Sequence, residues 1–147
     1  MKKHLLLIGG VVFLLAAGDA DDEVKKELAR FEGTWRWVLI ETEKMKIPED
    51  EISGPRMKLM GDKFTVNESA DATFSGTFKV DPSKKPKTID VTFTDGPDKG
   101  KTLLGIYELE GDTYKVCVDP EGKNRPTEFK IKPGSGHVLQ VLKREKK

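Results

Sequence analysis

The sequence has a single cysteine, Cys117, so no disulfide bond can form within the chain of 147 residues. It has two histidines, and only His137 lies beyond the N-terminal segment. With one Cys and one His there, a metal site built from these two residue types cannot be assembled. A small protein without disulfides depends on its core for stability. We expect the thiol to be buried, the alternative being a reactive or dimer-forming cysteine.

An excess of charge of one sign is also absent. The 26 basic and 25 acidic residues give a formal net charge of +1, which provides no bulk field to attract nucleic acid. The one basic run, Lys84 to Lys87, has no interleaved aromatic residues and is expected to be a solvated turn. We therefore predict no nucleic-acid partner.

A long apolar run is missing as well. The longest, Leu5 to Ala17, is shorter than the ~20 residues that a transmembrane helix needs. Lys2 and Lys3 precede it and small residues follow it, a pattern typical of a signal peptide. We predict a signal peptide over residues 1–20, a mature domain over 21–147 without a membrane span, and an extracytoplasmic location, periplasmic or secreted. The alternative is an uncleaved N-terminal anchor.

No group of residues forms a catalytic signature. Cys117 and His137 lie on different predicted strands, and nothing indicates a third group that would orient a nucleophile. The predicted loops carry several carboxylates: Asp95, Asp98, Asp119 and Glu121. Their spacing is not that of an EF-hand, so turn chemistry is the expectation and calcium binding the alternative. We predict no enzyme activity, no catalytic residues, no metal site and no cofactor.

The chain does contain clear hydrophobic periodicity. Residues 21–31 have apolar side chains at helical spacing and end before Gly33, which predicts a short amphipathic helix. From Thr34 onward, apolar residues recur at every second position. In the first strand this places Trp35, Trp37 and Leu39 on one face.

Eight further segments have the composition and alternation of strands. They are Arg56–Met60, Lys63–Asn67, Thr73–Val80, Thr88–Thr94, Lys101–Leu109, Thr113–Val118, Thr127–Ile131 and Val138–Lys143. Because no helix lies between them, they must pair as antiparallel hairpins. Such a meander hides its edges by closing on itself. The predicted fold is all-β, an antiparallel up-and-down barrel of about eight strands with a short N-terminal helix.

The motif Gly33-Thr34-Trp35, after a short helix and at the start of the first strand, resembles the G-x-W signature of lipocalins. In that family the Trp closes one end of the barrel and a basic residue near the end of the last strand stacks over it. The resemblance implies that Gly33, Trp35 and Arg144, or Lys143 in its place, close this barrel. A cation over an indole face contributes roughly 0.5–2 kcal/mol.

Longer segments carry a second resemblance. They are Glu32–Trp35, Gly61–Phe64, Gly76–Pro82, Lys84–Asp90, Gly96–Tyr107 and Arg125–Phe129. Together they resemble a lipocalin-like domain family found mainly in planctomycete bacteria, across nearly all of residues 22–144. That family has no characterised function, so the resemblance implies the fold and an exported location, and it assigns neither a catalytic residue nor a ligand contact.

An eight-stranded barrel is just wide enough to be filled by side chains or to hold one small ligand. We predict an exported, non-enzymatic protein that binds a small apolar or amphipathic molecule. The predicted lining residues are Trp37, Phe64, Phe78, Phe93 and Tyr107, with Arg56 as a polar anchor. The alternative is a solid-core structural or interaction module that binds a cell-envelope partner through the predicted loop from Glu41 to Pro55. A cavity of ~300 Å³ or more would favour ligand binding.

Overall fold

The computed structural model describes residues 21–69 and 72–146, and the predicted signal peptide lies outside them. Residues 21–31 are helical. The strands of this part of the chain are β1 (Gly33–Glu41), β2 (Lys46–Pro48), β3 (Arg56–Met60), β4 (Lys63–Asn67), β5 (Thr73–Asp81), β6 (Lys87–Phe93), β7 (Thr102–Glu110), β8 (Thr113–Asp119) and β9 (Val138–Arg144). A 3₁₀ helix, Glu49–Glu51, follows β2, so the predicted loop from Glu41 to Pro55 contains a short strand and a helical turn.

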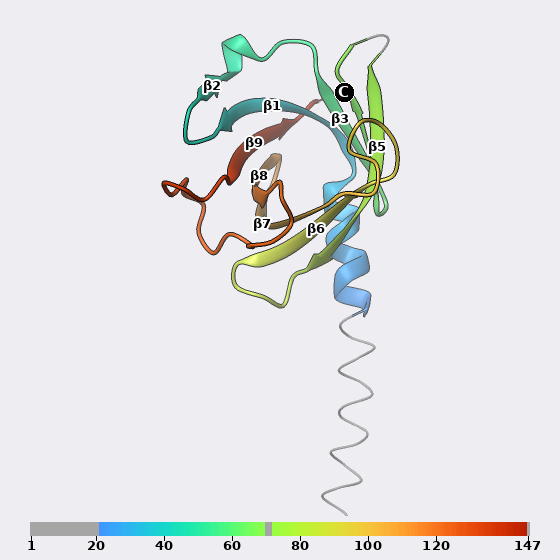
Figure 1. Ribbon diagram of the computed structural model, residues 1–147. Helices are drawn as coiled ribbons and strands as arrows, with labels where there is room; N and C mark the ends of the chain where they lie inside the picture. The colour runs from blue at the N-terminus through green and yellow to red at the C-terminus, as the bar shows by residue number, and fades with distance from the viewer. Residues whose placement is uncertain (1–20, 70–71, 147) are drawn as a thin grey trace, which may run out of the picture.

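The sheet closes on itself. Its strand order is β2-β1-β3-β4-β5-β6-β7-β8-β9, and β1 also pairs with β9, every pairing being antiparallel. The strands β1 and β3–β9 therefore form a closed eight-stranded barrel, while β2 is an addition to the end of β1. Figure 1 shows these strands arranged in a ring. The predicted fold class is confirmed.

The helix packs against one end of this ring. Phe31, its last residue, is fully buried and lies at ring-centroid distances of 5.1–5.4 Å from Phe78, Tyr107 and Tyr114. Leu28 and Val24, about one and two turns earlier, pack on the same core. The stripe expected from the helical spacing thus faces the barrel interior, and Figure 1 shows the helix, in blue, beyond one side of the ring of strands.

The first strand departs from strict alternation. In its pairing with β9, Trp37 lies opposite Leu142, but Leu39 lies opposite Val141, so the register shifts by one residue. Such a β-bulge reverses the faces of the residues that follow it. Consequently Ile40 packs on the core, and the prediction that Leu39 shares the inner face with Trp37 is wrong.

The predicted strand Thr127–Ile131 is also wrong. These residues belong to a loop between β8 and β9, here called the outer loop (residues 120–137), and most of them form bends. Phe129 and Ile131 pack against a small cluster formed by Ile106, Cys117 and Leu139. Because neighbouring residues in β7 and β8 face the barrel core, this cluster lies on the outer face of the sheet. The apolar residues of the segment are buried by side-chain packing without entering a ladder.

Candidate functional site

The end of the barrel next to the helix, here called the closed end, is sealed by aromatic and charged side chains. Trp35 is 0% exposed and its indole N–H donates to the Phe31 carbonyl oxygen at 2.8 Å. The Arg144 guanidinium lies 4.4 Å from the centroid of the Trp35 ring. It also donates to the carbonyl oxygens of Arg30 and Glu32, which the C-terminal end of the helix leaves unpaired.

Gly33 makes this arrangement possible. Its φ is +137°, a region that side chains rarely adopt, and a Cβ here would lie 3.0 Å from an Arg144 guanidinium nitrogen. The structure therefore brings together Gly33, Trp35 and Arg144, the three residues that the lipocalin resemblance implies. Lys143, the alternative basic residue, is exposed.

A buried carboxylate lies beside this seal. Glu27 is 5% exposed and accepts hydrogen bonds from Tyr107 Oη at 2.5 Å, Lys87 Nζ at 2.9 Å and Arg30 at 2.7 Å. Burial alone would raise the pKa of Glu27, but these hydrogen bonds outweigh it and hold the pKa below its ordinary value. Burial, together with the hydrogen bond to this carboxylate, raises the pKa of Tyr107. Glu27 thus ties the helix to β6 and β7.

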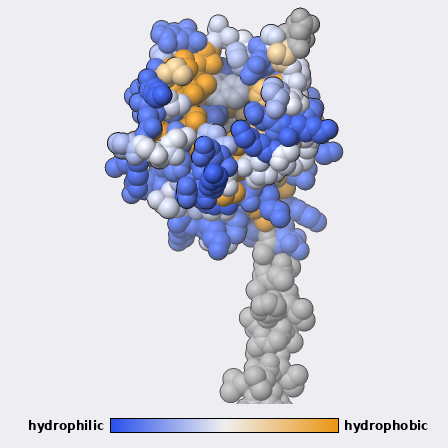
Figure 2. All heavy atoms as spheres, in the orientation of Figure 1, coloured by the Kyte–Doolittle hydropathy of each residue, from blue (hydrophilic) through white to orange (hydrophobic). Residues whose placement is uncertain are grey.

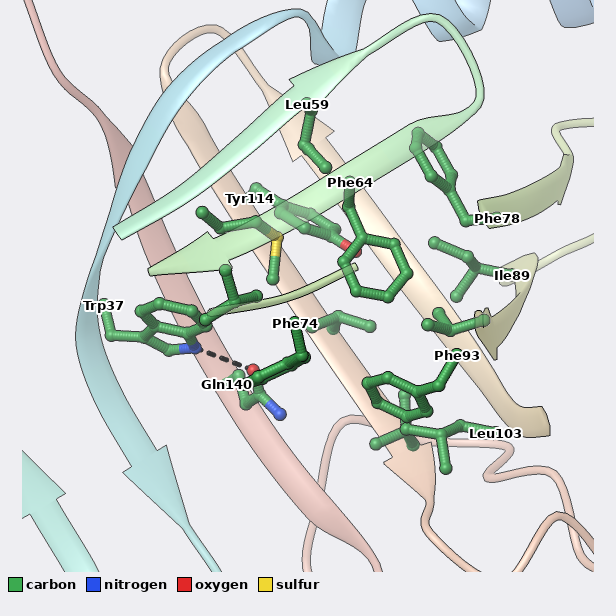
Figure 3. Close-up of a pocket in the computed structure, with 15 residues that line it drawn as sticks. Trp37, Leu59, Phe64, Phe74, Phe78, Ile89, Phe93, Leu103, Tyr114 and Gln140 are labelled. Carbon is green, nitrogen blue, oxygen red and sulfur yellow. Dashed lines mark hydrogen bonds between the residues drawn. The ribbon is translucent and has the colours of Figure 1, made fainter. Parts of the chain in front are cut away.

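The opposite end, here called the open end, contains a cavity of about 150 Å³. Its lining is almost entirely apolar and comes from β1 and β3–β9: Trp37, Met57, Leu59, Phe64, Val66, Phe74, Phe78, Ile89, Val91, Phe93, Leu103, Tyr114, Val116, Val118 and Gln140. Figure 3 shows these side chains converging from the strands. On the face seen in Figure 2, hydrophobic atoms border a hollow.

A glycine in β5, Gly76, allows the Phe64 ring to pack closely against the cavity wall. Gly76 of β5 lies opposite Phe64 of β4, and a Cβ at Gly76 would lie 2.6 Å from the Phe64 ring and 2.1 Å from the Thr92 carbonyl oxygen. Phe64 therefore lies directly over the glycine backbone. The space that a mid-strand glycine leaves is filled by this ring and does not add to the cavity.

Polar atoms on the cavity wall are few. The Trp37 indole N–H donates to Gln140 Oε1 at 2.8 Å, as the dashed line in Figure 3 marks. Tyr114 also lines the cavity and is 5% exposed, and burial raises the pKa of its hydroxyl. The cavity thus offers an apolar interior with two polar side chains, one of which is tied to the indole.

Four of the predicted lining residues border the cavity: Trp37, Phe64, Phe78 and Phe93. Tyr107 faces the interior but lies at the closed end, where its hydroxyl is bound to Glu27. Arg56 is not a polar anchor, because its guanidinium pairs with Glu145 and with the Pro55 carbonyl oxygen. Both residues lie outside the cavity.

Sequence reasoning missed Gln140, Glu27 and the role of Tyr114. Gln140 stands in a strand with apolar residues on both faces, because Leu139 packs in the outer cluster, so alternation alone did not show which way it points. Pairing with the inward-facing Val116 reveals it. Glu27 lies among other charges on the helix, and its position between Val24 and Phe31 on the apolar stripe was the available signal.

Two of the remaining candidates, Asp95 and Asp119, hold loops in place. Asp95 accepts from the backbone and hydroxyl of Ser75, and Asp119 accepts three backbone N–H groups within the outer loop. Burial raises the pKa of Cys117 to about 11, and His137 Nε2 lies 2.9 Å from the Asn124 carbonyl oxygen. Within residues 21–69 and 72–146, no cluster of three or more metal-ligating side chains occurs. No helix in those ranges is long and apolar enough to span a membrane.

Comparison of the chain with protein-family models, with curated proteins and with solved structures finds no match. The class that fold and site define is a closed antiparallel β-barrel with one end sealed by a helix and an apolar cavity at the other.

Proposed function

We propose that this chain is an exported, non-enzymatic, lipocalin-like protein that binds a small apolar or amphipathic molecule in the open end of its barrel. The observation that carries the proposal is the contrast between a tightly packed closed end and an apolar cavity at the other. Transfer of an apolar molecule from water into such a cavity is favoured by the hydrophobic effect. Non-covalent binding requires none of the acid–base groups that catalysis would need.

The size of the cavity limits the ligand. At about 150 Å³ it is half of the ~300 Å³ at which pockets for drug-sized ligands begin, so the interior is neither hollow nor packed solid. An engineered apolar cavity of about 150 Å³ in another protein binds benzene. The ligand that fits is therefore a molecule of about one ring, or the end of a larger molecule whose remainder lies in the mouth.

Two tryptophans allow a test with an internal control. The chain has only Trp35 and Trp37, and both indole N–H groups donate hydrogen bonds, one at the closed end and one at the cavity. In a titration with toluene followed by ¹H–¹⁵N NMR, the indole signal of Trp37 is expected to shift and that of Trp35 to stay. If toluene and 1-octanol shift neither signal, the cavity does not bind ligands, and the interaction module becomes the better hypothesis.

Export is proposed from the N-terminal sequence pattern. N-terminal sequencing of the protein isolated from its native host is expected to begin near Asp19 or Asp21. Recovery of an intact Met1 on all of the protein would contradict signal cleavage.

A further inference from the structure

The two tyrosines of the chain contrast in their hydrogen bonding. Tyr107 donates to Glu27 at the closed end. Tyr114 is equally buried, yet its hydroxyl takes part in none of the hydrogen bonds within residues 21–69 and 72–146. In those ranges every fully enclosed side-chain nitrogen or oxygen has a partner, so the Tyr114 oxygen borders open space. Since Tyr114 lines the cavity, that space is the ligand cavity.

Gln140 offers a second unused group. An indole N–H can only donate, so the Trp37 contact requires the amide of Gln140 to turn its oxygen toward the indole. The amide nitrogen, which carries two hydrogens, is then directed elsewhere. None of the hydrogen bonds in the described part of the chain uses it, and Figure 3 shows it pointing away from Trp37.

These two groups are close enough to serve one small molecule. Tyr114 pairs with Leu142 across β8 and β9, and Gln140 is two residues before Leu142 on the same face. The backbone positions of such diagonal neighbours are roughly 7–8 Å apart, within reach of long side chains, so one small molecule can contact both residues. The amide nitrogen of Gln140 can only donate, and the Tyr114 phenol, kept neutral by its burial, can donate too. A matching ligand therefore presents an acceptor.

We propose that the cavity selects an apolar ring compound that bears a carbonyl oxygen. Tyr114 donates a hydrogen bond to that oxygen, and Gln140 is a second donor to it. This inference rests on the proposed function and adds the class of ligand to it. Tyr114 and Gln140 are then the specificity-determining residues. A hydrocarbon of the same shape leaves the hydroxyl unpaired, and an analogue that fails to satisfy a buried polar group is disfavoured.

Acetophenone and α-methylstyrene form a suitable probe pair, because the second has a methylene group in place of the carbonyl oxygen. The intact protein is expected to bind acetophenone more tightly in calorimetric titration. Tyr114→Phe keeps the ring that packs on Phe31 and Trp35 but removes the donor. It is expected to weaken acetophenone binding about 5- to 100-fold and to leave α-methylstyrene binding within about 2-fold.

Two variants sharpen the result. Gln140→Glu keeps an oxygen for the Trp37 N–H and removes the amide donor, so it is expected to reduce the preference for the ketone. Tyr107→Phe, outside the cavity, is the matched control and is expected to leave the preference unchanged. If Tyr114→Phe weakens both probes equally, or neither, the carbonyl selectivity is overturned while the binding function stands. If the intact protein binds neither compound, both proposals are overturned.

Discussion

The two ends of the barrel use similar side chains for different purposes. Trp35 and Trp37 are two residues apart in β1 and both face inward, and each donates its indole N–H at 2.8 Å. The acceptor for Trp35 is a backbone carbonyl of the helix, whereas the acceptor for Trp37 is the side chain of Gln140. The backbone of the helix fixes the Trp35 indole, whereas a side chain that can rotate holds the Trp37 indole.

The use of hydrogen-bonding groups follows the same division. At the closed end, Glu27 and Arg144 use most of their hydrogen-bonding capacity within the protein. Around the cavity, Tyr114 and Gln140 keep hydrogen-bonding capacity unused. The comparison suggests that the closed end supplies stability, so that the open end can forgo close packing.

The largest expected effect comes from Trp35→Ala. Truncation of a fully buried aromatic side chain typically lowers the free energy of unfolding by about 3–5 kcal/mol, and here it also leaves the Phe31 carbonyl oxygen unpaired. Trp37→Ala is the matched control and is expected to destabilise less, because solvent can enter the space that it leaves at the mouth. Urea unfolding measures both, and equal losses would contradict the division between the ends.

Glu27→Gln is expected to lower the free energy of unfolding by about 1–3 kcal/mol at pH 7, the range for a buried charge-assisted hydrogen bond. The folded pKa of Glu27 lies below its unfolded value of 4.5. Its stabilisation is therefore fully present above pH 4.5 and is lost as the pH falls through the lowered folded pKa. Urea unfolding at several pH values measures the difference in free energy of unfolding between the intact protein and Glu27→Gln. This difference should narrow as the pH falls below 4.5.

Glu108→Gln serves as the control for that experiment. Glu108 and Lys115 are 4.0 Å apart and both are about two-fifths exposed, and such surface pairs contribute roughly 0–1 kcal/mol. A gap that stays constant down to pH 3, or one that Glu108→Gln reproduces, would show that Glu27 does not tie the helix to the barrel.

Arg144→Gln removes the cation over Trp35 and the hydrogen bonds to the end of the helix. A loss of about 1–2 kcal/mol is expected, since a partly desolvated cation–π contact contributes up to ~2 kcal/mol. Lys143→Gln, at an exposed neighbouring position, is the control, with an expected change within about 0.5 kcal/mol. Similar losses for both variants would remove Arg144 from the seal.

The smallest change in stability is expected for Leu103→Trp at the open end. Leu103 is half-buried and borders the cavity, so a larger side chain there can fill space without displacing packed atoms. The free energy of unfolding is expected to change by less than about 1 kcal/mol, while the toluene-induced shift of Trp37 disappears. A variant that still binds toluene would place the ligand outside this cavity.

The barrel was predictable because each hairpin carries its own evidence. Alternating apolar residues, with turn residues at each junction, identified β3–β9. Because these strands pair as hairpins, closure of the sheet into a barrel is the arrangement that leaves no exposed strand edges. The bulge after Trp37 was not predictable. All residues from Trp37 to Ile40 are apolar, so the sequence does not show which of them face the core. The strand predicted at Phe129 was wrong for another reason. An apolar pattern indicates that residues are buried, and here they are buried by packing against the outer face of the sheet, without pairing as a strand.

Part of the site followed from similar reasoning. Inward aromatic residues such as Phe64 and Phe93 could be found from strand period. Both tyrosine rings contact Phe31, but the Tyr107 hydroxyl binds Glu27 whereas Tyr114 borders the cavity. The depth of each side chain along the barrel, which decides this difference, could not be found in the same way. It depends on the stagger of neighbouring strands, which the sequence of one strand does not contain.

The outer loop has a practical consequence through Cys117, the single thiol of the chain. Cys117 is fully enclosed beneath Phe129 and Ile131, so a thiol reagent reaches it only when this covering lifts. The labelling rate, compared with that of a free thiol, then reports how often the covering opens. Since unfolding of the whole barrel exposes the same sulfur, the dependence of that rate on urea distinguishes local detachment from global unfolding. The labelling rate of Cys117 thus measures how often the outer loop detaches from the outer face of the barrel, which faces away from the cavity.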